Sequence, residues 1–457
     1  MTDSTTRRLG GTEWSWAQAV PGGTGITVVA ILLSKPPNLP HLQNALHKLQ
    51  NHHPILRSKF ISTPPSYSIL PSPFLQIQTV DIPTTSSLLQ TPQSSDPFPI
   101  SPLHRLLEHE LNINPWAHDI NGPIESDLVF ATLYALPDSN LVFALRLHTS
   151  ICDRTTAVAL MKELLVLMKE GEGGAEREFE KSGEDEVGLP VEELIPKGKA
   201  DKPIWTRGLD LVGYSLNSLR LAHLGFEDVA SSRRSEVVRL QMDENETSRF
   251  LAECKDRGIK LCGALAAAGL IAANSSKHLT DNESENYAVV SLIDCRKILD
   301  PPLHDHNLGF YHSAILNTHK ITNGEDVWDV AKRCYTVFSN AKNSNKHFTD
   351  MGDLNFLMCR AIENPGLTPS SSLRTSFMAV FEDPVIDDSG GSQVEVGLED
   401  YMGCASVHGI GPSIAVFDTV RDGRLDCAFV YPSPLHSRKQ MDGLINDMKA
   451  ILMGGGR

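Results

Sequence analysis

Apolar residues follow strand and helix patterns in turn along the first part of the chain. Residues 26–33 form a β-branched apolar run that ends before a pair of prolines, and this run predicts a strand. Leucine and alanine recur at helical spacing between Leu42 and Leu49, which predicts a helix. Serine, threonine and proline are abundant in residues 61–102, where we expect loops with short strands.

The apolar runs at residues 128–136 and 141–148 are separated by the turn-forming sequence Pro-Asp-Ser-Asn, so they predict a β-hairpin. A helix is expected to begin just after Asp153, because apolar residues then recur every three or four positions. Its predicted buried stripe consists of Val158, Met161, Leu165 and Met168.

The second half of the chain repeats this mixture of patterns, and its last two strands flank the turn sequence Arg-Asp-Gly-Arg. The predicted elements are strands at 235–240, 287–293, 413–417 and 425–431, and helices from Asp243 or Asn245 to Gly258, at 263–274 and at 441–453. Alternating strands and helices in both halves indicate an α/β fold in two lobes.

The length of 457 residues also exceeds what one ordinary hydrophobic core accommodates. Between the halves, residues 169–193 are acidic and weakly apolar, which is typical of a flexible linker or crossover segment. We therefore expect an N-terminal lobe at 1–168, a linker and crossover segment at 169–232, and a C-terminal lobe at 233–457.

Composition and charge narrow the function classes. The chain is 41% hydrophobic and 21% charged, as in soluble globular proteins, and its formal net charge is −15. An acidic surface repels a phosphate backbone, so we expect no nucleic-acid partner. No apolar run approaches the roughly 20 residues that span a bilayer, and no secretory signal follows the N-terminus. We expect a soluble, cytoplasmic protein without a membrane partner.

The eight cysteines are scattered, and no pair has C-x-x-C spacing. Reduced, partly buried thiols are the expected state, and no zinc or other metal site is predicted.

Residues 146–154 carry the most informative chemistry, with the sequence Arg-Leu-His-Thr-Ser-Ile-Cys-Asp-Arg at the end of a predicted buried strand. Taken alone, Asp153 is explained as a helix N-cap and His148 as a hydrogen-bonded histidine at a strand end. A purely structural strand end is more often apolar, however, so this cluster of polar side chains favours an active site.

This segment resembles the HHxxxDG motif of nonribosomal-peptide condensation domains and alcohol acetyltransferases, and the related HxxxD motif of plant BAHD acyltransferases. On this match, His148 takes the place of the first histidine and Asp153 that of the aspartate. Thr149 stands where the family has its catalytic histidine, and Arg154 stands where it has glycine.

Three other segments resemble the same superfamily in the same order along the chain. Residues 51–57 resemble RHPxLR, residues 254–273 resemble a C-x-x-x-G helix pair, and residues 294–309 resemble D-x-R-x-x-x-x-P-P-L-x-x-x-x-G. The BAHD signature DFGWG is absent, so the chain is more similar to condensation domains and alcohol acetyltransferases.

The resemblance implies two similar mixed-sheet lobes of the chloramphenicol acetyltransferase type, with a tunnel between them and the motif at its centre. It implies transfer of an acyl group from a CoA or carrier thioester to a small-molecule alcohol or amine, with acyl-CoA as co-substrate and no other cofactor. In the family the second histidine is the general base and the aspartate shapes the site. The family is commonly monomeric, so we expect a monomer.

A threonine hydroxyl is not basic near neutral pH, so the missing histidine needs a substitute. His148 is one candidate, if it turns into the site and Asp153 orients it. A histidine of the C-terminal lobe is another, and we consider His312 and His408. A Cys152 nucleophile is the weakest idea, because only Arg154 lies near it to lower its pKa.

Two alternatives stay open. In the first, the protein is an enzyme without this histidine: either its substrate is an amine that needs little help from a base, or its reaction is a cyclisation, deacylation or elimination. In the second, the protein is not catalytic and binds a small molecule on the acyltransferase scaffold. Thr149 and Arg154 favour the binding hypothesis, and the intact polar neighbourhood of the motif favours an enzyme. A protein that uses its acidic linker for interactions is the last-ranked reading.

Overall fold

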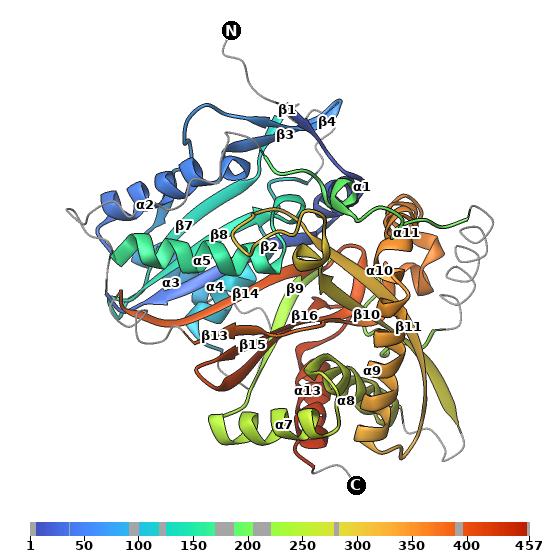
Figure 1. Ribbon diagram of the computed structural model, residues 1–457. Coiled ribbons are helices and arrows are strands. Elements are labelled where there is room, and N and C mark those ends of the chain that lie inside the picture. Colours follow the sequence, from blue (N-terminus) through green and yellow to red (C-terminus); the bar gives the residue numbers. More distant parts are fainter. Residues whose placement is uncertain are drawn as a thin grey trace.

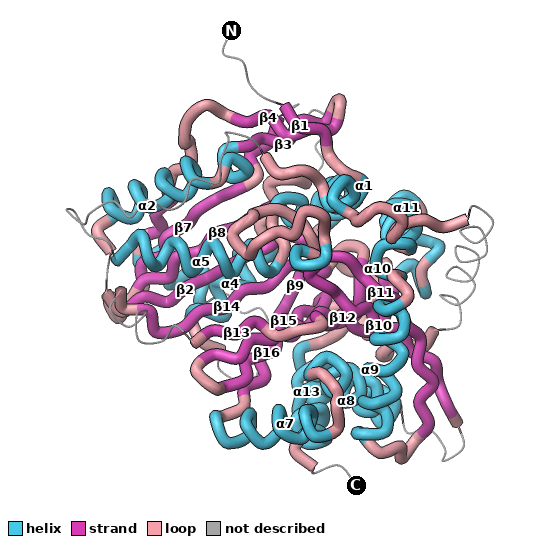
Figure 2. Tube along the Cα trace, in the orientation of Figure 1, coloured by secondary structure: helices cyan, strands magenta, loops and turns pink. Residues whose placement is uncertain are grey.

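The structure is a computed structural model, and it describes residues 6–35, 37–90, 100–117, 125–169, 187–203, 221–277, 283–388 and 396–454. The predicted acidic linker lies largely outside the described residues. Figure 1 shows two lobes that meet along their sheets, and Figure 2 shows helices packed on the outer faces of both.

The N-terminal lobe is built on a five-stranded mixed sheet with strand order β14-β2-β8-β7-β5. Its strands are β14 (Leu398–Val407), β2 (Thr24–Leu33), β8 (Leu141–His148), β7 (Val129–Ala135) and β5 (Ile77–Val80). A smaller sheet is ordered β1-β4-β3-β6, with β1 (Thr6–Arg8), β4 (Pro65–Ile69), β3 (Ser58–Ser62) and β6 (Glu125–Asp127). Its helices are α1 (Gly11–Ala19), α2 (Leu39–His52), α3 (Ile82–Gln90), α4 (Pro102–Leu111) and α5 (Arg154–Lys169).

The C-terminal lobe contains a seven-stranded mixed sheet ordered β11-β10-β12-β15-β16-β9, with β13 paired to β15. Its strands are β9 (Arg234–Gln241), β10 (Ser284–Asp294), β11 (His312–Thr322), β12 (Arg374–Phe381), β13 (Val385–Asp387), β15 (Gly411–Arg421) and β16 (Arg424–Ser433). Its helices are α7 (Glu244–Asp256), α8 (Leu261–Ser275), α9 (Val327–Asn343), α10 (Lys346–Thr349), α11 (Met351–Glu363) and α13 (Arg438–Leu452).

Strand β2 explains why the two lobes form one body. Val29, Ile31 and Leu33 face the core that α2 and α5 cover, whereas Val28 and Ala30 face a second core shared with the other lobe. Both faces are buried, so residues 28–33 of the strand are apolar at every position rather than alternating. The shared core includes side chains from β9, β15 and β16 of the large sheet.

The C-terminal part of the chain contributes one strand to the N-terminal sheet. Strand β14 lies in the C-terminal part of the sequence, but it pairs antiparallel with β2 and completes the edge of the N-terminal sheet. A buried ion pair between Glu108 on α4 and Arg438 on α13 (2.7 Å) also joins the lobes, and the same carboxylate accepts the backbone N–H of Val237.

Most predicted elements are present, and the helix from Asp243 is confirmed with a reciprocal cap between Asp243 and Glu246. The prediction of loops with short strands across residues 61–102 is partly wrong, because α3 forms there and α4 begins at Pro102. The missed signal is Asp81, whose side chain accepts the backbone N–H of Thr84 at the start of α3.

The predicted stripe of α5 is also partly wrong. Met161 and Leu165 are buried, but Val158 and Met168 are only half-buried. The helix packs on both the sheet and α2, which makes its buried face wider. That face consists of Thr156, Ala157, Leu160, Met161, Leu164, Leu165 and Leu167.

Within the part of the chain that the structure describes, no single helix is long and apolar enough to cross a bilayer. Helices α7 and α8 reach the required length only together, across a bend of 101°.

Candidate functional site

The motif segment leads from the N-terminal sheet to the lobe junction. Strand β8 ends at His148, a short 3-10 turn covers Thr149–Ile151, and α5 begins at Arg154. Asp153 accepts the backbone N–H of Thr156 at 2.8 Å, so it caps α5 as the sequence suggested. Its own N–H donates to the carbonyl oxygen of Gly309 in the other lobe. The motif therefore forms part of the contact between the lobes.

Thr149, the first residue of the 3-10 turn, is buried and held by hydrogen bonds. Its hydroxyl donates to the carbonyl oxygen of Gly25 at 2.6 Å, and it lies 2.7 Å from the hydroxyl of Thr27. Since Thr149 has one hydroxyl proton, the Thr27 hydroxyl is the donor in the second bond. Position 149 therefore has a structural role and offers no proton acceptor of useful basicity.

His148 is buried and neutral. Its Nδ1 accepts the backbone N–H of Ser150 at 3.1 Å, so the imidazole proton lies on Nε2. The ring stacks on Phe60 and meets Trp116 edge-on, and burial lowers the pKa of His148 to about 3. An imidazole in this tautomer, with its lone pair already bonded, is poorly suited to remove a substrate proton.

Asp153 is the centre of a buried ionic cluster. Its carboxylate lies 2.9 Å from Nη1 of Arg296 and accepts the backbone N–H of Tyr311 at 2.8 Å. Burial alone would raise the pKa of Asp153, but Arg296, and then His312, hold it well below its usual range. The carboxylate is therefore ionised, and it fixes the loop after β10 against the start of α5.

His312 is brought to Asp153 from the other lobe. It is the first residue of β11, it is buried, and its Nδ1 lies 3.0 Å from Oδ2 of Asp153. The Nδ1–H does not point straight at this oxygen, so the contact is electrostatic rather than a well-aligned hydrogen bond. The ring also contacts Phe310 and Phe381. Position 312 thus supplies a carboxylate-oriented imidazole.

Further aromatic side chains contact the two rings that touch this imidazole. Trp16 of α1 contacts Phe310 with ring centroids 5.4 Å apart, and Phe381 contacts Phe417 at the same separation. Trp16 also lies beside Gly25, which has a φ of +91°. The aromatic residues and Arg296 were not named as site residues from the sequence. For Arg296, the D-x-R resemblance was an available signal.

The other candidate residues occupy different places. Cys152 is part of the N-terminal core, and burial followed by Asp153 raises the pKa of its thiol. His408 lies 3.0 Å from the hydroxyl of Ser235, and burial lowers its pKa to about 4. Its contacts within the described residues do not reach Asp153 or His312. Arg154 extends to the C-terminal lobe.

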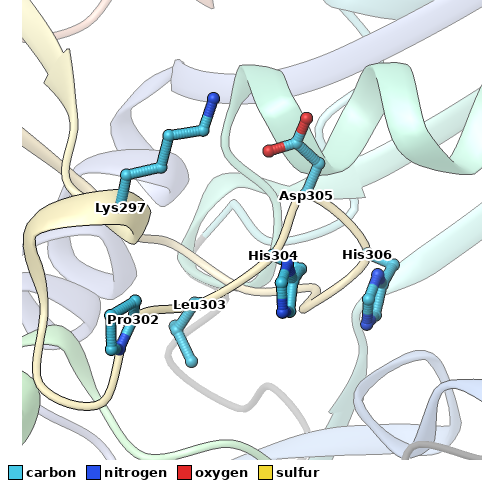
Figure 3. A pocket seen from close by; sticks show the side chains of 6 residues that line it. All are labelled: Lys297, Pro302, Leu303, His304, Asp305 and His306. Carbon is cyan, nitrogen blue, oxygen red and sulfur yellow. The ribbon is translucent and has the colours of Figure 1, made fainter.

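The histidines near the Pro-Pro-Leu sequence are separated by the fold. His304 and His306 are exposed and stack on each other, with ring centroids 5.3 Å apart, whereas His312 is buried. A surface hollow of about 510 Å³ lies beside them. Figure 3 shows the side chains that line it, which are Lys297, Pro302, Leu303, His304, Asp305 and His306. Across the described ranges, no three His, Cys, Asp or Glu side chains are placed to hold a metal ion.

Sequence and structure comparisons agree with this architecture. The pattern of the phthiocerol/phthiodiolone dimycocerosyl transferase C-terminus family matches residues 231–340. No curated protein matches the chain.

Three solved structures illustrate the likeness. The TRI3 trichothecene 15-O-acetyltransferase from Fusarium sporotrichioides is 12% identical, with a TM-score of 0.70 over 99% of this chain and 95% of its own. The EpoB NRPS cyclization-docking bidomain from Sorangium cellulosum is 14% identical, with a TM-score of 0.67 over 98% and 85%. The polyketide synthase associated protein 5 from Mycobacterium tuberculosis is 16% identical, with a TM-score of 0.60 over 98% and 99%.

These likenesses confirm the predicted mixed α/β fold, which the chain shares with an acetyltransferase and with a cyclization-docking bidomain.

Proposed function

We propose that the protein transfers an acyl group from a thioester to a small-molecule alcohol or amine, with His312 as the general base. The observation that carries this proposal is the 3.0 Å contact between His312 Nδ1 and Asp153 Oδ2. An imidazole beside an ionised carboxylate at the lobe junction supports this role in a chain whose motif position 149 is a threonine.

The proposed reaction balances through one imidazole. Nε2 of His312, the ring nitrogen other than the one that contacts Asp153, removes the proton of the acceptor hydroxyl or amine. The acceptor oxygen or nitrogen attacks the thioester carbonyl, the C–S bond breaks, and the leaving thiolate takes the proton from the imidazolium. Asp153 remains ionised throughout and stabilises the imidazolium, as a carboxylate does for a catalytic histidine.

Arg296 contributes by fixing the carboxylate. It lies against Asp153 in a buried pair, so the carboxylate cannot rotate freely away from His312. The acyl donor is proposed to be an acyl-CoA, in agreement with the acetyltransferase among the similar folds. A carrier-bound thioester and a cyclisation reaction are the variants suggested by the cyclization-docking bidomain.

A test combines CoA release with substitution of the base. The purified chain is incubated with a panel of acyl-CoAs and simple alcohols or amines, and released CoA is measured. Acceptor-dependent release should fall by ~10²–10⁴ in His312→Gln. His304→Gln is the matched control, because this imidazole is exposed on the surface hollow, and it should retain full release. Full release by folded His312→Gln would exclude His312 as the base.

The second candidate function is a small-molecule binder on the same scaffold, and the hydrogen-bonded Thr149 favours it. In that case acyl-CoAs or other thioesters raise the melting temperature while no donor and acceptor combination releases thiol.

A further inference from the structure

Arg154 stands where the similar motif has glycine, and its side chain crosses from α5 to the C-terminal lobe. Its Nη1 donates to Oδ1 of Asp418 on β15 at 2.7 Å, and its Nη2 donates to the carbonyl oxygen of Asp383 at 2.7 Å. Both partners of the Arg154–Asp418 pair are largely buried, with side-chain exposures of 10% and 1%. Arg154, the residue after Asp153, therefore binds the C-terminal lobe through two hydrogen bonds.

The guanidinium group also covers an aromatic ring. Its carbon lies 4.0 Å from the ring centroid of Phe381, which is within the range of a cation–π contact. Phe381 in turn meets the imidazole of His312 at 88°, with ring centroids 5.7 Å apart. Consecutive residues of the motif thus reach His312 by two routes: Asp153 directly, and Arg154 through Phe381.

The buried ion pair is not arranged for maximal stability. The second carboxylate oxygen of Asp418 is buried and has no hydrogen-bond partner within the described residues. A desolvated ion pair with an unsatisfied oxygen is a weak source of stability, and apolar side chains often serve as well or better. Its geometry, by contrast, fixes the position of Phe381 on one face.

We infer that Arg154 is a positioning residue: it holds Phe381 against His312 and so keeps Nδ1 of His312 on Asp153. The catalytic meaning of this arrangement rests on the proposed function, but the arrangement itself can be tested without turnover. Loss of the guanidinium frees Phe381, and the imidazole then rotates and samples both tautomers. With Arg154 in place, Nδ1 carries the proton and Nε2 carries the lone pair.

Nitrogen NMR of the full chain labelled with ¹⁵N-histidine reads this tautomer directly. The signals of His312 are assigned by their loss in His312→Gln. In the unsubstituted protein, Nδ1 should show the shift of a protonated nitrogen and Nε2 that of an unprotonated one. In Arg154→Lys, which keeps the positive charge but loses the planar fork, the two shifts should move toward each other. Phe381→Leu should have the same effect while leaving the Arg154–Asp418 pair intact.

The matched control is Arg239→Lys. Arg239 also pairs with two carboxylates, Asp400 and Asp426, but these contacts do not involve His312. It should leave the His312 shifts unchanged. Unchanged His312 shifts in both Arg154→Lys and Phe381→Leu would overturn the inference.

A kinetic measurement separates this inference from the proposed function. If acyl transfer is found, Arg154→Lys should lower kcat about 10-fold or more with little change in KM, because the base and not the binding of substrate is disturbed. Absence of turnover in the unsubstituted protein, together with the expected NMR change, would remove the proposed function and leave the positioning role standing. Turnover together with unchanged His312 shifts would support the proposed function and overturn the positioning role of Arg154.

Discussion

The hydroxyl of Thr149 donates to the carbonyl oxygen of Gly25, 2.6 Å away on strand β2, and Thr27 completes the chain of hydrogen bonds. Thr149→Val keeps the shape and leaves both partners unsatisfied, so we expect a loss of about 1–3 kcal/mol in the free energy of unfolding. Thr149→Ser should restore most of it. Urea unfolding measures both. If Thr149→Val abolished CoA release as completely as His312→Gln, a purely structural role for Thr149 would be wrong.

Gly25 itself should resist substitution. Its φ of +91° disfavours any side chain, and an added Cβ would lie 3.0 Å from both Thr149 Oγ1 and a ring carbon of Trp16. Gly25→Ala should therefore lower the free energy of unfolding by about 1–3 kcal/mol. Gly403→Ala on the adjacent strand β14 is the control, since a Cβ there meets its nearest atom only at 3.8 Å. Equal effects of the two substitutions would refute this explanation.

The buried pair of Asp153 and Arg296 should show strong coupling. Asp153→Asn keeps an acceptor for the cap of α5 but leaves the guanidinium with only Asp294, a partly exposed carboxylate, as its charge partner, and we expect a loss of about 3–5 kcal/mol. Arg296→Met leaves the buried carboxylate with His312 but without the guanidinium. The double variant should lose clearly less than the sum of the single losses, and a double-mutant cycle by chemical denaturation measures the difference. Additive losses would mean that the two charges do not depend on each other.

Acidification should already destabilise the protein at pH values higher than those at which carboxylates titrate, because several histidines are buried. Burial lowers the pKa to about 3 in His148 and to about 4 in His223, His319, His347, His408 and His436. In the unfolded chain these groups have a pKa near 6.5. Above pH ~6.5 both states are neutral at these positions. Below it the unfolded chain binds protons that the folded chain excludes, so stability falls between about pH 6.5 and 4.

Melting temperature measured from pH 8 to 4.5 tests this expectation, and the slope of unfolding free energy against pH counts the protons taken up. His436→Gln should reduce that count by nearly one at pH 5. Carboxylates with a lowered pKa, such as Asp153, also stabilise the folded state, and this contribution is lost only at still lower pH, where they become protonated. A flat profile between pH 6.5 and 5 would contradict the burial argument.

How much could be predicted from the sequence depends on how local each signal is. The hairpin of β15 and β16 was evident because its turn contains Asp422 and Gly423, both at positive φ. The cap of α7 was equally local. By contrast, α3 has a single buried side chain, Thr85, so apolar spacing gave no warning of it.

The candidate site divides in the same way. Residues 148–154 could be located because they are contiguous, and the role of Asp153 as a cap follows from its place before α5. The sequence offered His312 and His408 on equal terms. Only the packing of β11 against the start of α5 distinguishes them, since it depends on a separation of 159 positions between Asp153 and His312. The crossing of Arg154 to Asp418 depends on lobe docking and carried no local signal.

Strand β14 has a consequence during synthesis. Until residues 398–407 leave the ribosome, β2 has no partner on one side, and its apolar sequence forms an open edge of the N-terminal sheet. Nearly nine-tenths of the chain is made before that edge can close. A nascent chain paused before β14 is therefore exposed to edge-to-edge aggregation, and a fragment cut between the lobes inherits the same defect permanently.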